Sequence, residues 1–459
     1  MTDLYDELFP TTRRALLHRI AVAQTEGRTP SLVAAVVRDG RPVWSGARSM
    51  IDGHAPTPDV QYRIGSITKT FVAVLVLRLR DEGLLDLADP LGRHLPGTAA
   101  DGATVAQLLS HSAGLAAETP APWWERTDGA LRPELADVLE GERPLRHPAG
   151  RLHHYSNPGF ALLGALVERL RGEPWGDVLH REVLEPLGMD RTTLLPQHPH
   201  AGGFAVHPWA DVMLPEPLTD TGVMAPAGQL WSTTTDLARW AAFLATGDDK
   251  VLAADTVAEM RRPAVGPEGD DWSDSYGLGL QLIRHEGRLL HGHSGSMPGF
   301  SAGLWISGTD GLAAITMANA TNGTNTTRVA ADLIALTARH EPRLPEPWRP
   351  LPEVDEELLA LTGPWYWGAA GHALHLKADR VLELVTLTGG ARHSRFRPEP
   401  DGTWTGLDNY YAGETLRIVR TADGSVSHLD LGSFVLTREP YGPADVIPGG
   451  LDPRGWSAG

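Results

Sequence analysis

Cysteine is absent from this 459-residue chain. Disulfide bonds, thiolate nucleophiles and thiolate metal sites are therefore excluded, and any chemistry must come from other side chains. Basic residues are also in deficit, because 40 Lys and Arg face 57 Asp and Glu for a formal net charge of -17. This charge opposes binding to nucleic acid or to anionic lipid, so we expect neither a nucleic-acid nor a membrane partner.

Long apolar runs are missing as well. No stretch reaches the roughly 18 consecutive apolar residues that a membrane-spanning helix needs. The first residues, MTDLYDELFPTTRRALLHRI, are acidic and amphipathic, unlike the basic segment and continuous apolar stretch of a secretory signal. We expect a globular protein of about two or three domains, located in the cytoplasm.

A proline-rich segment, EPRLPEPWRPLP at 341–352, is the clearest linker in the sequence and predicts a boundary between domains 1–340 and 353–459. The first domain begins and ends with strand and helix patterns and encloses a helical insert, so its predicted class is α+β, an antiparallel sheet flanked by helices. The predicted helices are 4–26, 67–82, 104–110, 134–140, 158–171, 234–245 and 325–339. The predicted strands are 31–38, 41–47, 276–284, 288–292, 300–306 and 312–318.

Beyond the linker, short strand-like segments alternate with turn signals. Examples are ALHLK, VLELVTL, TLRIVR, SVSHLDL and FVLTR. Their spacing of about ten residues is typical of an antiparallel sheet or a small barrel. We therefore predict an all-β C-terminal domain.

A serine and a lysine lie one helical turn apart in Ser66-Ile67-Thr68-Lys69. Gly65 precedes the pair, and an apolar run without Pro or Gly follows it, which predicts a buried helix that begins near Ser66. The i, i+3 spacing places the amine and the hydroxyl on one face. Burial would lower the pKa of the amine, so that it could accept the serine's proton.

A second pair of polar side chains lies in Tyr155-Ser156-Asn157, just before the apolar segment FALLGALVERL. In an extended tripeptide the first and third side chains point to the same side. Tyr155 and Asn157 are therefore expected to face one cleft, with Ser156 turned away. The phenol can relay a proton, and the carboxamide can hold a substrate amide.

The stretch GHSGSMPGF at 292–300 is one glycine short of the G-x-S-x-G nucleophile elbow. An elbow needs a helix directly after the serine, whereas Pro298 and Gly299 follow here. Ser294 is therefore not the expected nucleophile. His293 and Gly295 are expected to face inward from a strand, where the glycine lets backbone approach a ligand closely.

The order S-x-x-K, Y-x-N, H-x-G resembles the penicillin-recognising serine hydrolases, which include DD-peptidases, class C β-lactamases, D-aminopeptidases and related esterases. The resemblance covers nearly all of residues 5–340, including TVAQLLSHSAGL and PAGQLWSTTTDLARW. It implies a β-lactamase/transpeptidase-like fold and an acyl-enzyme mechanism. The implied catalytic residues are Ser66 as nucleophile, Lys69 as base or proton shuttle, Tyr155 as proton exchanger, Asn157 as holder of the acyl amide, and His293 on the facing strand.

The same resemblance implies a substrate-binding set. The N–H groups of Ser66 and Ser296 would form the oxyanion hole, with Gly295 on the facing strand. Gly228 would border the cleft, and Gln229 stands where relatives commonly have glycine. His111, in LLSHSAGL, is expected to be structural. No metal is expected, because the other histidines do not fit an H-E-x-x-H helix.

His293 is the main departure from the family pattern. β-Lactamases and many DD-peptidases have a lysine there that binds the substrate's carboxylate. A histidine is largely neutral near pH 7. The sequence therefore favours relatives that act on amides, esters or thioesters without a free carboxylate at that point.

The C-terminal sheet, ending GSFVLTREPY, resembles a lipocalin-like domain that is appended to some of these enzymes. This combination is similar to the stand-alone penicillin-binding-protein-type thioesterases. It implies that the chain takes a nonribosomal peptide with a C-terminal D-residue from a peptidyl carrier protein and cyclises it, without a cofactor. Arg438 or Arg417 would bind a peptide carbonyl or carboxylate, or would be a surface arginine. A cytoplasmic D-stereospecific peptidase or esterase remains the alternative.

Overall fold

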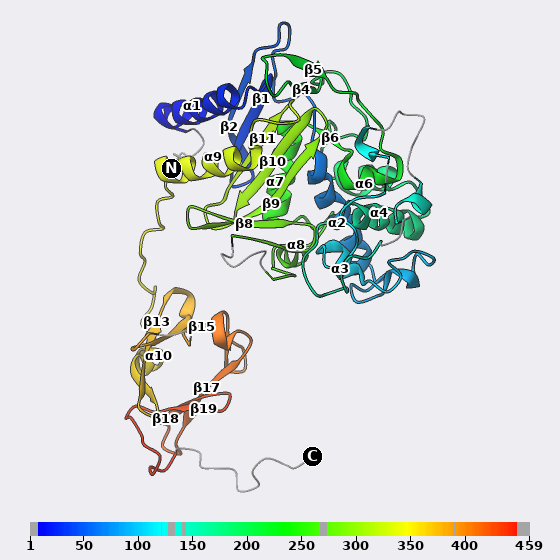
Figure 1. Ribbon diagram of the computed structural model, residues 1–459. Helices are drawn as coiled ribbons and strands as arrows, with labels where there is room; N and C mark the ends of the chain where they lie inside the picture. Colours follow the sequence, from blue (N-terminus) through cyan, green and yellow to red (C-terminus); the bar gives the residue numbers. More distant parts are fainter. Residues whose placement is uncertain are drawn as a thin grey trace. The chain divides into compact units, whose positions relative to one another are not determined.

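A seven-stranded antiparallel sheet forms the centre of the first unit of the chain (Figure 1). The computed structural model describes residues 8–120, 122–126, 134–139, 144–266, 273–389 and 392–447. Two units divide between Arg343 and Leu344. In sheet order, the strands are β2 (Arg41–Ser49), β1 (Ser31–Arg38), β11 (Leu312–Ala318), β10 (Phe300–Ser307), β9 (Arg288–Met297), β8 (Gln281–His285) and β7 (Asp274–Tyr276).

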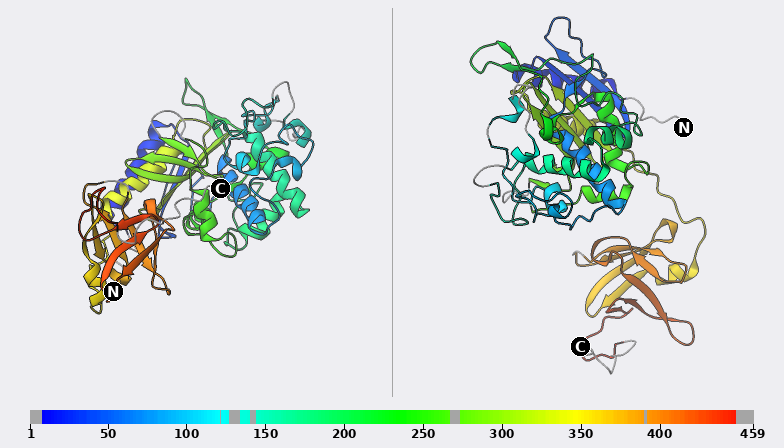
Figure 2. Two further views of the ribbon diagram at one scale, coloured as in Figure 1. Left: turned by 90° about the horizontal axis from the view of Figure 1, so that it is seen from below. Right: turned by 90° about the vertical axis from the view of Figure 1, so that its right-hand side faces the viewer.

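Helices cover both faces of this sheet. On one face, α1 (Pro10–Glu26) packs beside α9 (Thr326–His340), and the further views show this blue and yellow pair opposite the helical insert (Figure 2). The other face is covered by the insert and by α7 (Thr234–Thr246). The α+β class predicted from the sequence, an antiparallel sheet flanked by helices with a helical insert, is confirmed.

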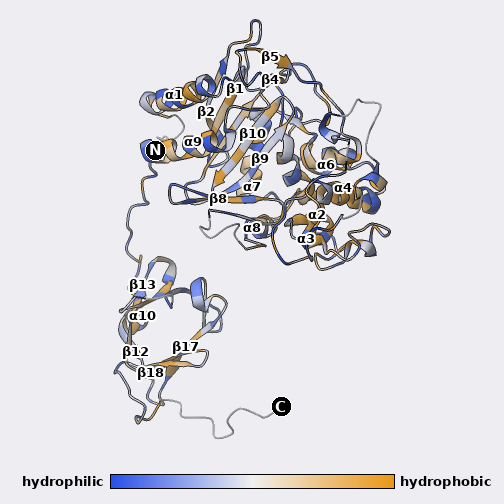
Figure 3. Cartoon of the chain, in the orientation of Figure 1, coloured by the Kyte–Doolittle hydropathy of each residue, from blue (hydrophilic) through white to orange (hydrophobic). Residues whose placement is uncertain are grey.

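The helical insert is organised around α2 (Thr68–Asp81), which is buried on nearly all sides and is strongly hydrophobic in Figure 3. A helix without a polar face must lie inside a protein. It packs against α4 (Asn157–Arg171) and the short α6 (Ala225–Gly228). The remaining insert helices are α3 (Val105–Leu109), α5 (Trp175–Leu179) and α8 (Ala254–Met260), with short turns at Gly65–Ile67 (η1), Leu91–Arg93, Trp124–Arg126, Leu135–Asp137, His180–Leu184 and Gly222–Met224. The small strands are β3 (Tyr62–Arg63), β4 (Phe204–Val206), β5 (Met213–Pro215) and β6 (Trp231–Ser232).

Three predicted elements differ from the observed ones. The single strand predicted at 276–284 is two strands, β7 and β8, because the chain turns between them with Gly279 at φ +76°. The helix predicted at 134–140 is only the turn Leu135–Asp137 in its described part. The first helix begins at Pro10, since proline suits the first turn of a helix. Residues 4–7 of that prediction lie outside the described residues.

The second unit is a nearly closed antiparallel barrel. Its eight strands follow chain order around the sheet, and β12 meets β19 through the bridge between Tyr366 and Thr437. The interior holds Trp365, Phe396 and Trp404 among other apolar side chains. The elements are α10 (Glu356–Leu361), β12 (Gly363–Trp367), β13 (Ala370–Leu376), β14 (Leu382–Thr386), β15 (Ser394–Pro398), β16 (Trp404–Gly406), β17 (Thr415–Arg420), β18 (Val426–Leu431) and β19 (Phe434–Leu436), with short turns at Ala378–Arg380 and Asn409–Tyr411. Among the described residues, no helix is both long and apolar enough to cross a membrane.

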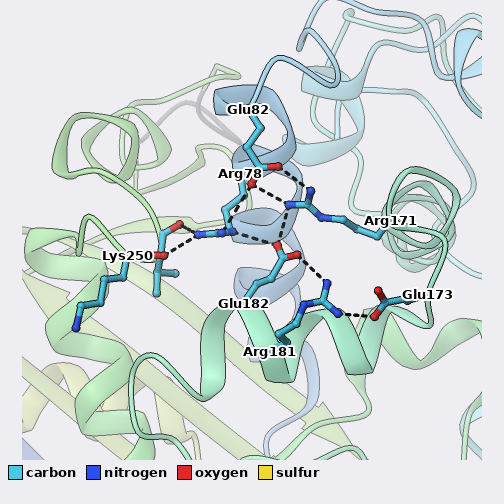
Figure 4. Close-up of polar contacts among 8 residues, drawn as sticks. Arg78, Glu82, Arg171, Glu173, Arg181, Glu182 and Lys250 are labelled. Atoms are coloured by element: carbon cyan, nitrogen blue, oxygen red, sulfur yellow. Dashed lines mark hydrogen bonds and ion pairs between the residues drawn. The ribbon is translucent and has the colours of Figure 1, made fainter.

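A network of ion pairs joins the C-terminal ends of α2 and α4 (Figure 4). Arg171, the last residue of α4, donates to both carboxylate oxygens of Glu82 and to Glu182 at 2.7, 2.9 and 2.8 Å. Arg78 on α2 reaches the same Glu182 at 3.2 Å. Because Lys69 and Asn157 lie at the opposite ends of these two helices, the network fixes the relative position of the helices that carry them.

Replacing Arg171 by Gln should therefore destabilise the first unit by about 1–2 kcal/mol, since two carboxylates lose a largely buried partner. Arg181 provides a matched control, because it pairs with Glu173 and Glu182 from a more exposed position. Arg181→Gln should cost clearly less stability, because solvent screens its ion pairs. Both values can be measured from the urea-induced unfolding transition of the first unit. Equal losses in the two variants would show that the ion pairs between α2 and α4 stabilise the unit no more than the exposed pairs of Arg181 do.

Candidate active site

Ser66 lies in the turn η1, immediately before α2. Gly65 before it has φ +53°, and a Cβ there would lie only 2.4 Å from the backbone nitrogen of Ser296. Only glycine accepts both this conformation and this close contact with β9. The sequence thus brings the Ser66 hydroxyl to the N-terminal end of a buried helix and against a strand from the far end of the chain.

Lys69 is fully buried beside this serine. Its Nζ donates to Ser66 Oγ at 2.9 Å, to Asn157 Oδ1 at 2.7 Å and to the Ala227 carbonyl at 2.6 Å. Burial lowers the pKa of Lys69 to about 7, although the nearby Glu118 raises it. In the neutral amine, Asn157 and Ala227 can accept the two N–H bonds, which leaves the lone pair directed at the serine hydroxyl.

Tyr155 is the third group around the hydroxyl. Its phenol hydrogen-bonds with Ser66, and burial raises its pKa above the usual value of 10.0. A phenol of this kind keeps its proton near neutral pH, whereas about half of the Lys69 amines would be unprotonated. The geometry therefore suits Lys69 as the base and Tyr155 as a proton donor, a choice that the sequence left open.

Asn157 is the first residue of α4, and Ser156 is its N-cap. The pair behaves as predicted: Asn157 faces Lys69, while the Ser156 hydroxyl points away and donates to the Ala116 carbonyl. The Asn157 Nδ2 donates to Glu118 Oε1 at 2.6 Å. Glu118 thus engages one of the two N–H groups of the carboxamide that was expected to hold the substrate's amide.

Two contributors to the site were missed by the sequence analysis. Ala227 acts through its backbone carbonyl, which no side-chain motif can reveal. Glu118 lies in a loop, in AAETP, where a single acidic residue carries no pattern. Its second oxygen accepts from Trp124 Nε1 at 2.8 Å, so the buried Trp124 supports the site while the neighbouring Trp123 is exposed.

The predicted oxyanion hole has a consistent backbone geometry. A two-residue turn follows Met297, so Met297 and Phe300 form the hydrogen-bonded pair that closes the hairpin. Ser296, one residue further from the turn, pairs with Ser301 without such bonds, and its N–H therefore points away from β10. That N–H lies beside Gly65, and a Cβ on Gly295 would lie 3.3 Å from the Ser66 nitrogen. The backbone nitrogens of Ser66 and Ser296 therefore lie close to each other, as an oxyanion hole requires.

His293 lies on β9 and is enclosed by protein groups. It is fully buried, with the Tyr276 hydroxyl 2.9 Å from its Nε2 and the Ser294 carbonyl 2.5 Å from its Nδ1. A carbonyl only accepts, so Nδ1 carries the proton and Tyr276 donates to Nε2. Burial lowers the pKa of His293 to about 3, which makes it neutral. Tyr276 on β7 therefore covers the His293 ring, a contact that the sequence analysis did not foresee.

His111 has a more specific role than a general structural one. The Ser156 N–H donates to its Nδ1 at 3.0 Å, and the His154 N–H donates to its carbonyl at 2.7 Å. These bonds hold the backbone in place on both sides of Tyr155. The centroids of the His111 and Tyr155 rings are 4.1 Å apart. His111 adopts φ +56°, an uncommon value for a residue with a side chain.

Gly228 and Gln229 lie behind the reacting groups rather than along an open cleft wall. A Cβ on Gly228 would be 3.0 Å from Met297 Sδ, so the glycine permits α6 to pack against β9. The buried Gln229 points away and accepts from Arg63 at 2.8 Å and from Thr221 Oγ1 at 2.8 Å. The glutamine therefore holds buried polar groups together without changing the surroundings of Ser66.

Arg438 is engaged within its own unit. Its guanidinium donates to the Thr362 and Pro364 carbonyls at 3.0 and 3.1 Å and also to the Ala360 carbonyl. The group lies 4.1 Å from the centroid of the Trp365 ring. These contacts tie α10 to the barrel, and they correct the expectation that Arg438 binds substrate. Arg417, the alternative, is exposed on β17.

The β-lactamase family model matches residues 16–339. The chain belongs to the β-lactamase family. A domain of unknown function matches residues 354–438. Penicillin-binding protein 4 of Amycolatopsis lactamdurans is 29% identical over 329 residues, which are 66% of this chain and 84% of that protein.

Solved structures of related proteins are also similar to this β-lactamase-family chain. The D-stereospecific amidohydrolase from Streptomyces sp. has a TM-score of 0.60 at 25% identity and covers 72% of this chain and 99% of its own. SurE has a TM-score of 0.58 at 25% identity and covers 94% of this chain and 99% of its own. The chain is thus a serine hydrolase of the penicillin-binding-protein and β-lactamase family, as the motifs predicted.

The rate of Ser66 acylation should rise with pH through a midpoint near 7. The rising limb reports deprotonation of Lys69, whose pKa lies near 7 because of burial. Glu118→Gln removes a negative charge that raises this pKa, so the midpoint should move to lower pH. The exposed Glu185→Gln is the control and should leave the midpoint unchanged. Stopped-flow acylation by an activated ester measures the profile, and a midpoint near 10 would show that burial does not lower the pKa of Lys69.

Substitution of His111 should slow acylation through Tyr155. His111→Leu loses the acceptor for the Ser156 N–H and should lower the rate by about 10²-fold. His111→Asn keeps an acceptor oxygen and tolerates positive φ, so its loss should stay within about tenfold. In a Tyr155→Phe background, His111→Leu should add little, since the two residues act as one unit. Equal losses in the Leu and Asn variants, or additive losses with Tyr155→Phe, would contradict this role.

Proposed function

We propose that this chain is a serine acyltransferase that accepts a peptidyl thioester from a carrier protein and releases the peptide as a macrocycle. The acyl group would end in a D-residue. Ser66 would carry the peptidyl ester, and the peptide's own amine would displace it. No external cofactor is needed for either half-reaction.

The proposal rests on the charges around Ser66. Among the described residues, the carboxylates of Glu118 and Glu125 raise the pKa of Lys69 by their negative charge, and His293 is neutral. Among these described groups, a substrate carboxylate beside the scissile bond would meet no fixed positive charge other than Lys69 itself and would be repelled by the two acids. A neutral thioester suits this site, and an incoming amine is attracted to it.

The proton transfers follow from the contacts. As Ser66 Oγ bonds to the thioester carbon, its proton passes to Lys69 Nζ, and the carbonyl oxygen lies at the N–H groups of Ser66 and Ser296. The C–S bond then breaks, and the leaving thiolate takes a proton from Tyr155, which Lys69 restores. In the second half, the amine attacks the ester, its proton passes back through Tyr155 and Lys69, and Ser66 Oγ recovers it as the ester bond breaks.

The relatives support a D-residue and the two-unit arrangement. One structural relative is a D-stereospecific amidohydrolase, and one structure of SurE is described as SurE with D-Leu. The match to SurE extends over 94% of this chain, whereas the amidohydrolase covers 72%. SurE is therefore similar over both units, and the amidohydrolase over a smaller part.

A D-stereospecific peptidase or amidase is the second candidate. It shares the first half-reaction, and the similarity to the amidohydrolase favours it. The two candidates differ only in the group that attacks the Ser66 ester, which is water in one case and the peptide's amine in the other.

A linear peptide with a C-terminal D-residue, supplied as its N-acetylcysteamine thioester, separates the candidates. We expect a cyclic product and a transient peptidyl adduct on Ser66, both seen by mass spectrometry. The diastereomer with a C-terminal L-residue and the Ser66→Ala variant are the controls, and neither should give product. Free acid alone would support the hydrolase, and an adduct that persists in Ser66→Ala would refute the acyl-enzyme.

A further inference from the structure

The two ends of the C-terminal barrel differ in chemistry. Because the eight strands run antiparallel in chain order, alternate connections meet at the same end. The connections after β13, β15 and β17 have the polar sequences KADRV, EPDGT and TADGS. The connections after β12, β14, β16 and β18 meet at the opposite end, here called the aromatic end.

Four segments bring one arginine and three aromatic rings together at the aromatic end. Arg392, from the connection before β15, places its guanidinium 4.8 Å from the Trp367 ring centroid and 5.0 Å from those of Tyr410 and Phe434. Trp367 ends β12, Tyr410 lies between β16 and β17, and Phe434 begins β19. The site is therefore built from all four connections of that end.

The same end carries the exposed apolar side chains of the barrel. Between β12 and β19, the large apolar residues that the structure describes as exposed are Trp367, Leu387, Leu407 and Tyr410. Each of them ends a strand or lies in a connection at the aromatic end. An exposed apolar patch confined to one mouth of a barrel is typical of a ligand site.

Arg392 differs in its partners from five other arginines of this unit. Among the described residues, no hydrogen bond or ion pair engages its guanidinium. In contrast, Arg438 donates to backbone carbonyls. Ion pairs join Arg380 to Asp355, Arg395 to Asp408, Arg397 to Glu399 and Arg420 to Glu357. The three rings are at most weak acceptors of its N–H groups, so these donors remain able to bind a ligand.

We propose that the aromatic end binds a carboxylate that is attached to an apolar group. The carboxylate would accept two N–H bonds from Arg392 in the plane of the guanidinium, and the apolar group would lie on Trp367, Tyr410 and the exposed leucines. A planar carboxylate matches the fork of an arginine. The site lies entirely within the second unit, so it is independent of the reaction proposed for Ser66.

The charge of the site favours a carboxylate over a phosphate. One guanidinium balances one negative charge, whereas a phosphate monoester carries close to two near pH 7 and would need further donors. The neighbouring His372 supplies no second positive charge, because burial and the charge of Arg392 lower its pKa. The apolar surroundings also suit a ligand whose carboxylate is its main polar group.

Titration calorimetry on the full chain carrying Ser66→Ala tests the site with octanoate as the probe. We expect octanoate to bind and octanamide, which has the same chain without the charge, to bind at least tenfold more weakly. Arg392→Gln should weaken octanoate binding at least tenfold. Arg397→Gln is the matched control, since this exposed arginine of the same unit pairs with Glu399.

Tyr410→Ala provides a second variant, because this exposed side chain can be removed without opening the barrel core. It should weaken octanoate binding several-fold, and this expectation holds even if Arg392→Gln fails to fold. Unchanged octanoate binding in Arg392→Gln or Tyr410→Ala would overturn the proposal, as would equal binding of octanamide. Tighter binding of phosphopantetheine than of octanoate would replace the carboxylate by a phosphate and overturn the proposed ligand class.

Discussion

Burial of the Lys69 amine is the constraint on which the catalytic unit depends. A charged ammonium loses its hydration inside a protein, so burial lowers its pKa to about 7 and makes a neutral base available near neutral pH. The surrounding structure must then hold its hydrogens in place. Asn157 at the start of α4 and the Ala227 carbonyl of α6 do so, and the ion pairs at the far ends of α2 and α4 stabilise the same arrangement.

Close backbone packing provides the rest of the site. Glycines at 65 and 295 let η1 approach β9 so closely that a Cβ at either position would collide with backbone. The N–H groups of Ser66 and Ser296 can therefore border one space. Behind them, His111 grips the backbone around Tyr155, and its neutral ring adds no charge beside Lys69. The desolvation of Lys69 and the close packing of η1 against β9 together determine the site.

Some arginines of the two units have different kinds of partner. In the catalytic unit, Arg171 and Arg78 share carboxylates and serve the packing of helices. In the barrel, Arg438 joins α10 to β12 by carbonyl contacts, while Arg392 lies among three rings. For a chain with a net charge of -17, a cation without a carboxylate partner is a feature that the surrounding structure must support. The rings supply this support through their negative faces.

The sequence by itself determined the α+β class, most helix and strand positions and the local pairs Ser66–Lys69 and Tyr155–Asn157, because helical spacing and an extended tripeptide encode them. That the two pairs share one site was implied by the family resemblance. The sequence could not resolve the turn between β7 and β8, and so it missed Tyr276 covering His293. It also missed Ala227, Glu118 and the partners of Arg438, which are long-range contacts without a local pattern. Only tertiary structure decides which distant atoms share a buried space, and desolvation in that space sets the protonation state of each group.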